Sequence, residues 1–124
     1  MACILIVEDS PDNMKLFRTL LAMNGHEVIG LPGGDDLLDQ VRSANPDLIL
    51  MDLQLPGRDG YQLLQELRAA DLAQRVVALT AHAMAGERER AVEAGFDSYI
   101  TKPIDVRQFP EQVRRVLAGE TIIG

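Results

Sequence analysis

Short runs of aliphatic residues alternate along the chain with longer segments in which apolar residues recur every three or four positions. Five of these runs are predicted to be strands: residues 3–7, 27–30, 48–51, 76–79 and 98–100. The first, third and fourth runs are continuously apolar, which is typical of central parallel strands buried on both faces. The second and fifth runs carry a weaker strand pattern.

Helical spacing of apolar residues follows each predicted strand. It is found over residues 14–21, 37–44, 63–67, 83–94 and 106–117. Ser10 and Pro11 are favoured at the start of the first helix, and Gly25 is favoured just past its end. The pattern therefore predicts five helices that alternate with five strands.

Two of these helices carry a local conflict. From residue 83 to residue 94 the apolar positions are mostly alanine, so this helix has a high intrinsic propensity but little to bury. We expect it to be the loosest helix of the fold. Pro110 removes a backbone donor in the last segment, so that helix is expected to start late or to begin with a distorted turn.

Strict alternation of strands and helices predicts an α/β fold with a doubly wound parallel sheet and helices on both faces. Right-handed crossover connections then fix most of the topology. Ligands of such folds bind beyond the carboxyl ends of the strands. The residues at those ends are therefore the candidates for a functional site.

The composition narrows the classes of function. A length of 124 residues, with 47% hydrophobic and 25% charged residues, indicates one folded domain. The formal net charge of −7 disfavours a phosphate backbone as partner, so we expect no direct binding to nucleic acid. No apolar run approaches the roughly 18 residues of a membrane span, and no signal segment opens the chain, so a cytoplasmic protein is expected. Cys3 is expected to be a small buried hydrophobe.

Polar residues with complementary chemistry stand at the predicted strand ends. They are Glu8 and Asp9 after the first strand, Asp52 after the third, Thr80 after the fourth, and Lys102 with Pro103 after the fifth. Three carboxylates in one crevice repel each other, and a single amine offsets only part of that charge. Hard oxygen ligands of this kind suit Mg²⁺, which also accepts carbonyl, water and phosphate oxygens.

Asp52 is the candidate nucleophile of this group. A carboxylate with one oxygen available can attack phosphorus and form an aspartyl phosphate. Asp52 closes the most apolar strand, so the sheet is expected to hold it rigidly. Thr80 can hydrogen-bond one phosphoryl oxygen and Lys102 can contact another.

Five short motifs carry a resemblance to a known family. They are Ile-Val-Glu-Asp at 6–9, Asp-Leu-Ile-Leu-Met-Asp at 47–52, Leu-Pro-Gly with Asp-Gly at 55–60, Leu-Thr-Ala at 79–81, and Tyr-Ile-Thr-Lys-Pro at 99–103. In this order and spacing the chain resembles the receiver domain of two-component response regulators over essentially all of residues 1–124. Residues 8–13 and 81–84 resemble both stand-alone cell-division regulators and the receivers of hybrid histidine kinases. The resemblance implies a flavodoxin-like (βα)5 fold with strand order 2-1-3-4-5.

The resemblance also implies the roles of single residues at the acidic end of the sheet. Asp52 is implied to be the phosphorylated residue. Glu8 and Asp9 are implied to bind Mg²⁺ together with Asp52 and with the backbone carbonyl of Gln54. Lys102 is implied to contact the phosphoryl group.

Further implied roles concern the switch and the phosphate lifetime. Thr80 is implied to be the switch hydroxyl, and Tyr99 the aromatic residue that turns inward when Thr80 moves to the phosphoryl group. The bond between Lys102 and Pro103 is implied to be cis. The side chains of Gln54 and His82 are expected to tune hydrolysis.

The function that follows is that of a single-domain response regulator. Asp52 would accept a phosphoryl group from a histidine kinase or a histidine phosphotransfer protein, in a Mg²⁺-dependent step. The output would be a changed surface over the fourth helix, fifth strand and fifth helix, recognised by a downstream protein. Residues 119–124 are too few for an output domain, so a receiver without one is expected, as a monomer or a weak phosphorylation-dependent dimer.

Three other functions stay open on the residues alone. A degenerate receiver would bind partners without phosphorylation, although that class commonly lacks an acidic or lysine position. An aspartate-nucleophile phosphatase commonly carries an acid two residues after the nucleophile, where Gln54 stands. A flavin-binding electron carrier needs a glycine- or hydroxyl-rich loop after the first strand, whereas Glu8 and Asp9 would repel a phosphate. For single residues, Tyr99 can be simple packing with a solvated hydroxyl, and His82 a solvated loop residue.

Overall fold

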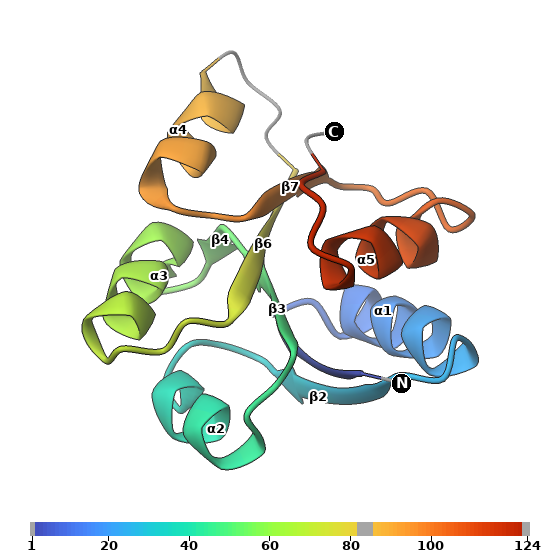
Figure 1. Ribbon diagram of the computed structural model, residues 1–124, viewed down its shortest axis with the longest axis horizontal. Coiled ribbons are helices and arrows are strands. Elements are labelled where there is room, and N and C mark those ends of the chain that lie inside the picture. Colours follow the sequence, from blue (N-terminus) through green and yellow to red (C-terminus); the bar gives the residue numbers. More distant parts are fainter. Residues whose placement is uncertain (1, 82–85, 123–124) are drawn as a thin grey trace.

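A parallel five-stranded sheet forms the centre of the protein (Figure 1). The computed structural model describes residues 2–81 and 86–122. The strands are β1 (Cys3–Val7), β2 (Glu27–Leu31), β3 (Leu48–Asp52), β6 (Arg75–Thr80) and β7 (Ser98–Thr101). Their spatial order, β2-β1-β3-β6-β7, is equivalent to the expected order 2-1-3-4-5. The flavodoxin-like fold predicted from the sequence is therefore confirmed.

Five helices cover the two faces of this sheet. They are α1 (Pro11–Met23), α2 (Leu37–Ala44), α3 (Gly60–Ala69), α4 (Glu87–Ala94) and α5 (Phe109–Leu117). Helices α1 and α5 lie on one face, and α2, α3 and α4 lie on the other (Figure 1). The structure is thus doubly wound, as the alternating pattern predicted.

The register of the sheet brings the candidate residues to one edge. Asp52 at the end of β3 pairs with Leu79 of β6, and the next residue, Thr80, pairs with Thr101 of β7. Val7 ends β1 in pairing with Met51. Because all strands run in the same direction, the residues that follow them gather beyond the same edge.

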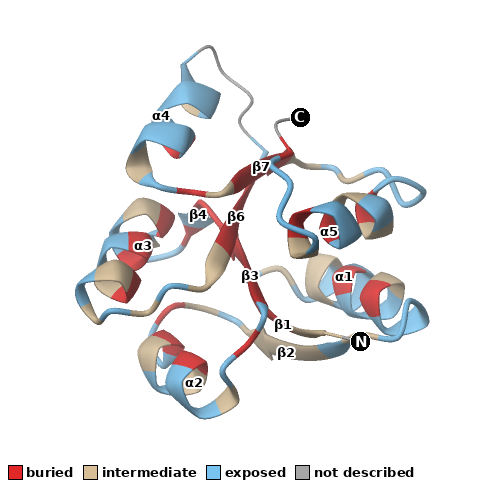
Figure 2. Ribbon diagram, in the orientation of Figure 1, coloured by how far each residue is buried: buried red, intermediate tan, exposed pale blue. Residues whose placement is uncertain are grey.

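Each face of the sheet has its own apolar core (Figure 2). Between the two cores β3 is fully buried, whereas the edge strand β2 is only partly buried. On the α1–α5 face, the rings of Phe17 and Phe109 stack with centroids 5.3 Å apart. On the opposite face, Leu63, Leu64 and Leu67 of α3 are buried. The continuous apolar strands of the sequence are therefore the shared floor of two cores.

The ends of α1 and α5 follow from local sequence signals. The Ser10 side chain accepts a hydrogen bond from the backbone N–H of Asn13 at 3.3 Å, as expected of a capping serine. Helix α5 begins at Phe109, so it starts late and Pro110 falls within its first turn, where no backbone donor is needed. Val106 lies outside the helix and is 51% exposed.

Helix α4 is shorter in the described residues than the sequence pattern predicted. It covers Glu87–Ala94, and Gly86 and Gly95 flank it with positive φ angles of 89° and 108°. Residues 83–85 of the expected helix lie outside the described residues. Ala91 is its buried residue, which agrees with the small apolar face seen in the sequence.

A small antiparallel hairpin, β4 (Gln54–Leu55) with β5 (Arg58–Asp59), was not predicted. It turns at Gly57, whose φ is +74°. Gly60 follows it, and an added Cβ there would lie 3.0 Å from the carbonyl oxygen of Asp52. A close approach to the end of β3 therefore requires this glycine.

Asp59 and Cys3 stand at the starts of two further elements, α3 and β1. The Asp59 side chain accepts a hydrogen bond from the backbone N–H of Tyr61 at 2.8 Å, so Asp59 begins α3 as a capping residue. Cys3 was expected to be buried, but it is half-buried. This difference arises because Cys3 opens β1, where the sheet meets solvent.

Candidate functional site

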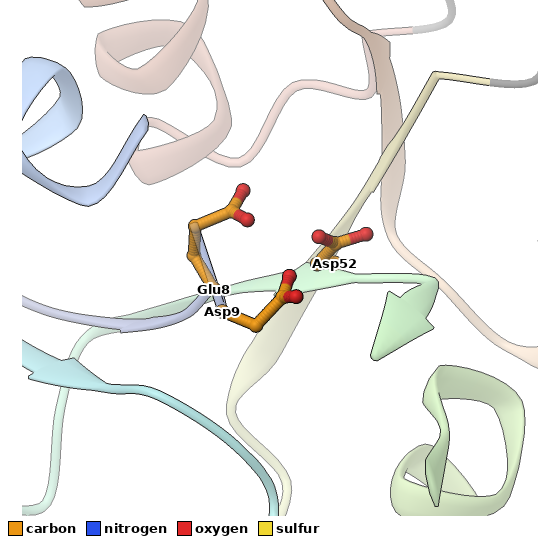
Figure 3. A group of neighbouring side chains, drawn as sticks. All are labelled: Glu8, Asp9 and Asp52. Carbon is orange, nitrogen blue, oxygen red and sulfur yellow. The ribbon is translucent and has the colours of Figure 1, made fainter. Parts of the chain in front are cut away.

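Three carboxylates meet beyond the ends of β1 and β3 (Figure 3). Glu8 and Asp9 come from the segment after β1, and Asp52 is the last residue of β3. One oxygen of each carboxylate lies within 4.8 Å of the others. Glu8 and Asp52 are each 2% exposed, whereas Asp9 is exposed at the rim of the pocket. Two buried acids and one accessible acid thus share one small volume.

Lys102 compensates part of this negative charge. Its Nζ donates to Oε1 of Glu8 and to Oδ2 of Asp52, both at 3.0 Å. The Lys102 side chain is 13% exposed, so these are largely buried ion pairs. Burial lowers the pKa of Lys102, but the bonds to Asp52 and Glu8 outweigh it, and the net effect is a raised pKa. The lysine therefore stays charged.

Backbone N–H groups hold the remaining carboxylate oxygens. The N–H of Ser10 donates to Oε2 of Glu8 at 3.1 Å, and the N–H of Gln54 donates to Oδ1 of Asp52 at 2.9 Å. Burial raises the pKa of Glu8, and the hydrogen bonds from Ser10 and Lys102 offset this only in part. These bonds fix the direction in which both acids present their oxygens.

The donor set of this pocket fits Mg²⁺. The ligand atoms are hard carboxylate oxygens, and the accessible Asp9 leaves a side on which water ligands can remain. The backbone carbonyl of Gln54 belongs to the residue whose N–H already touches Asp52. Glu8, Asp9 and Asp52 are the groups that could hold the ion, and the role of the Gln54 carbonyl stays a prediction.

Thr80 and Gln54 are joined at the same edge. Thr80, at the end of β6, is fully buried. Nε2 of Gln54 donates to Oγ1 of Thr80 at 2.9 Å, and Oε1 of Gln54 accepts from the N–H of Ala81 at 3.4 Å. The sequence indicated Thr80 and Gln54 separately, but it gave no signal for this contact.

Tyr99 is buried in β7 and is only 1% exposed. Its hydroxyl has no hydrogen-bond partner among the described residues. Burial raises the pKa of this phenol, and the nearby carboxylate of Glu87 adds to the effect. The ring therefore packs in the core, as the simpler interpretation predicted, but its hydroxyl is not solvated. The switch role of Tyr99 stays a prediction.

The structure places two further candidates as follows. The peptide bond between Lys102 and Pro103 is cis. His82, predicted to tune hydrolysis, lies outside the described residues.

One cluster near the site was not found from the sequence. The Tyr61 hydroxyl donates to Oε1 of Glu87 at 3.3 Å, and the Arg90 guanidinium lies 4.3 Å from the Tyr61 ring centre. Burial is the largest of the causes that raise the pKa of Tyr61 to about 12. No sequence pattern indicates these contacts, because a sequence does not show which side of a short helix faces a ring.

A buried Asp at the end of the third strand of a parallel sheet, with two more acids and a lysine around it, defines a class of site found in signalling domains. The sequence model of the response regulator receiver domain matches residues 4–114. The chain belongs to this family, which is a signalling domain of two-component systems and binds Mg²⁺ at an acidic pocket.

Individual relatives agree with this assignment. The polar-differentiation response regulator DivK of Brucella anthropi is 43% identical over 116 residues, which cover 92% of this chain and 94% of that protein. The sensor protein GacS of Pseudomonas syringae pv. syringae is 42% identical over 115 residues, which cover 89% of this chain but 13% of that protein. The signal receiver domain of a signal transduction histidine kinase from Syntrophus aciditrophicus has a TM-score of 0.84 at 32% identity, over 96% of this chain and 92% of that one.

Within residues 2–81 and 86–122, none of the helices combines the length and the apolar character that crossing a membrane requires.

Proposed function

We propose that Asp52 accepts a phosphoryl group from a histidine kinase or a histidine phosphotransfer protein, and that the phosphorylated chain signals by contact with a downstream protein. The observation that carries this proposal is the convergence of Glu8, Asp9 and Lys102 on a buried Asp52. The relatives include a response regulator and a sensor protein, which are the two kinds of protein in which a receiver of this type is expected to work.

In the proposed transfer, a carboxylate oxygen of Asp52 forms a bond to phosphorus while the phosphorus–nitrogen bond of the donor phosphohistidine breaks. The electron pair of that bond stays on the imidazole, which leaves. Glu8, Asp9, Asp52 and the Gln54 carbonyl would hold Mg²⁺. When bound, the ion would offset the negative charge of the phosphoryl oxygens. The sheet holds Asp52 in place, and its N–H bond from Gln54 orients the carboxylate.

Lys102 has a double role in this proposal. Before transfer it offsets part of the negative charge of Glu8 and Asp52, which favours the ionised form of each acid. After transfer its ammonium group can turn from the Asp52 oxygen to a phosphoryl oxygen at little distance. Thr80 supplies the hydroxyl that contacts another phosphoryl oxygen.

The proposed output is a changed surface over α4, β7 and α5. Tyr99 lies in β7 and its ring is buried beneath this surface, next to the charges of Glu87 and Glu89. Movement of Thr80 would alter the space available to the Tyr99 ring, and hence the position of α4. We expect a monomer, or a weak dimer that forms on phosphorylation.

A phosphatase activity has less support. The position two residues after Asp52 is Gln54, whose amide group contacts Thr80 and cannot act as a general acid at neutral pH. A receiver that works without phosphorylation remains the second candidate and is decided by the experiment below.

The test is incorporation of an acid-stable, base-labile phosphate from acetyl phosphate in the presence of Mg²⁺, read as the mass of the intact protein. The wild type and Asp39→Asn, a change at an exposed acid of α2, should both gain one phosphoryl group. Asp52→Asn and the wild type in EDTA should gain none. Labelling of folded Asp52→Asn, or no labelling of the folded wild type with Mg²⁺, would overturn the proposal.

A further inference from the structure

We infer that the carboxamide of Gln54 closes the phosphoryl position of the unphosphorylated chain and has to withdraw before a phosphoryl group can be bound there. This inference rests on the proposed function of Asp52. It assigns Gln54 a role in accepting the group, in addition to the expected role of its side chain in hydrolysis.

The contacts of Gln54 with the site come from both its backbone and its side chain. Its backbone N–H donates to Oδ1 of Asp52 at 2.9 Å, and its Nε2 donates to Oγ1 of Thr80, also at 2.9 Å. Its Oε1 accepts from the N–H of Ala81 at 3.4 Å, a longer and weaker contact. One residue thus spans the distance between the phosphoacceptor and the end of β6.

The amide bridge occupies groups that a phosphoryl group on Asp52 would use. Phosphoryl oxygens are acceptors, and the N–H of Ala81 already donates to the amide oxygen of Gln54. The bond to Thr80 fixes where the hydroxyl oxygen lies. The Ala81 contact would have to break, or lengthen, when a phosphoryl oxygen accepts from the same N–H. Thr80 Oγ1 is the acceptor in its bond with Gln54, so this bond does not compete for a donor but restrains movement of the hydroxyl toward the phosphoryl group.

The displacement is favourable only when the charged group has arrived. A neutral carboxamide oxygen is a weaker acceptor than a phosphoryl oxygen, because hydrogen bonds to an ionised acceptor are roughly twice as strong. The bridge therefore holds Thr80 in the resting position, yet it yields to the phosphoryl group itself.

The surroundings of Gln54 allow this withdrawal without a change in the core. Gln54 is an exposed residue. It also lines a cleft of about 480 Å³ between the β4–β5 hairpin and α4, together with Leu55, Tyr61 and Arg90. The amide group can move into this solvated space while its backbone N–H stays on Asp52.

The test compares Gln54→Met, which keeps the length of the side chain but removes the amide, with Gln62→Met, the same change at an exposed position of α3. Beryllium trifluoride serves as a non-hydrolysable mimic of the phosphoryl group, and its affinity is measured with Mg²⁺ by NMR titration. We expect Gln54→Met to bind it about three- to tenfold more tightly than the wild type, the weight of one neutral hydrogen bond. Gln62→Met should be unchanged.

A second measurement needs neither metal nor mimic. The backbone N–H of Ala81 should exchange with solvent faster in free Gln54→Met than in the free wild type, because its acceptor is gone. A third measurement uses Mg²⁺ and acetyl phosphate. Phosphorylation of Gln54→Met should be faster than that of the wild type, by a factor similar to the gain in affinity.

Equal affinity and equal Ala81 exchange in Gln54→Met and the wild type would overturn the inference. So would a variant in which only the loss of the phosphoryl group changes speed, since that result assigns Gln54 to hydrolysis alone. Both outcomes leave the proposed function intact, because the latter fails only if the wild type itself takes no phosphoryl group on Asp52.

Discussion

Helices α5 and α4 lie on opposite faces of the sheet and are held with different strength. On the α1–α5 face, α5 buries Phe109, Val113 and Val116, and the Phe109 ring stacks on Phe17 of α1. On the other face, Ala91 is the buried residue of α4, and this helix has a glycine and no capping side chain at its start. Helix α5 is joined to the sheet by large apolar side chains, and helix α4 is not.

This difference indicates where a local charge event can have its effect. The free energy that a phosphoryl group can contribute is limited, so it shifts most readily the element whose packing against the sheet is weakest. Helix α4 is held through polar and aromatic contacts at its side, where Glu87 and Arg90 meet Tyr61. The pocket therefore lies between a firm frame and a helix that small changes can shift.

The firm side is tested by the largest expected loss. Phe109→Ala removes a fully buried ring together with its stacking contact on Phe17, so the free energy of unfolding should fall by about 4 kcal/mol. Val92→Ala, at an exposed position of α4, should change it by less than about 0.5 kcal/mol. Urea denaturation followed by circular dichroism measures both. Similar losses of the free energy of unfolding in the two variants would contradict the contrast between α5 and α4.

Lys102 follows β7 and contacts Glu8, which follows β1, and Asp52, which ends β3. It therefore links the centre of the sheet to the edge strand beside α4. Lys102→Met should lower the free energy of unfolding by about 3 kcal/mol, because it leaves Glu8 and Asp52 buried without a counter-charge. Added Mg²⁺ should recover part of this loss. The control is Lys15→Met, at an exposed position of α1. A loss in Lys102→Met that Mg²⁺ leaves unchanged would argue against a shared charge balance.

The side contacts of α4 are tested by a matched pair of variants on that helix. Arg90→Gln removes the cation above the Tyr61 ring and should lower the free energy of local opening of α4 by about 0.5 to 1 kcal/mol. Arg88→Gln makes the same change at an exposed neighbouring position. Amide hydrogen exchange of α4 and α5 separates local from global effects. Equal exchange of α4 in the two variants would show that Tyr61 does not hold the helix.

The smallest effect is expected on the firm side, at His26. Burial lowers the pKa of this imidazole, whose Nδ1 accepts a hydrogen bond from the N–H of Ala2. A pKa below the ordinary value of 6.5 means that the unfolded chain binds the proton more readily than the folded chain. The free energy of unfolding of the wild type should therefore fall as the pH is lowered below 6.5. In His26→Gln it should fall less steeply. Parallel pH profiles of the two proteins would refute this assignment.

The sequence was sufficient for the sheet but not for the contacts at its edge. Continuous apolar runs and the acids that follow them depend on local pattern, and they predicted the strands and the gathering of Glu8, Asp9 and Asp52, whereas the strand order was implied by the resemblance to receiver domains. The β4–β5 hairpin was missed because two-residue strands have no periodicity. The contact of Gln54 with Thr80 depends on side-chain rotamers and on residues 26 positions apart, which no spacing in the chain reveals.

The central claim, that a group on Asp52 acts mainly on the loosely held helix α4 and the strand β7 beside it, is tested most directly by backbone NMR with Mg²⁺ and beryllium trifluoride. The account predicts large chemical-shift changes in the wild type at Gln54, Thr80, α4 and β7, small changes in α2 and in the buried residues of α1, and none of these changes in Asp52→Asn. Changes spread evenly over both faces, or the same changes in Asp52→Asn, would contradict it.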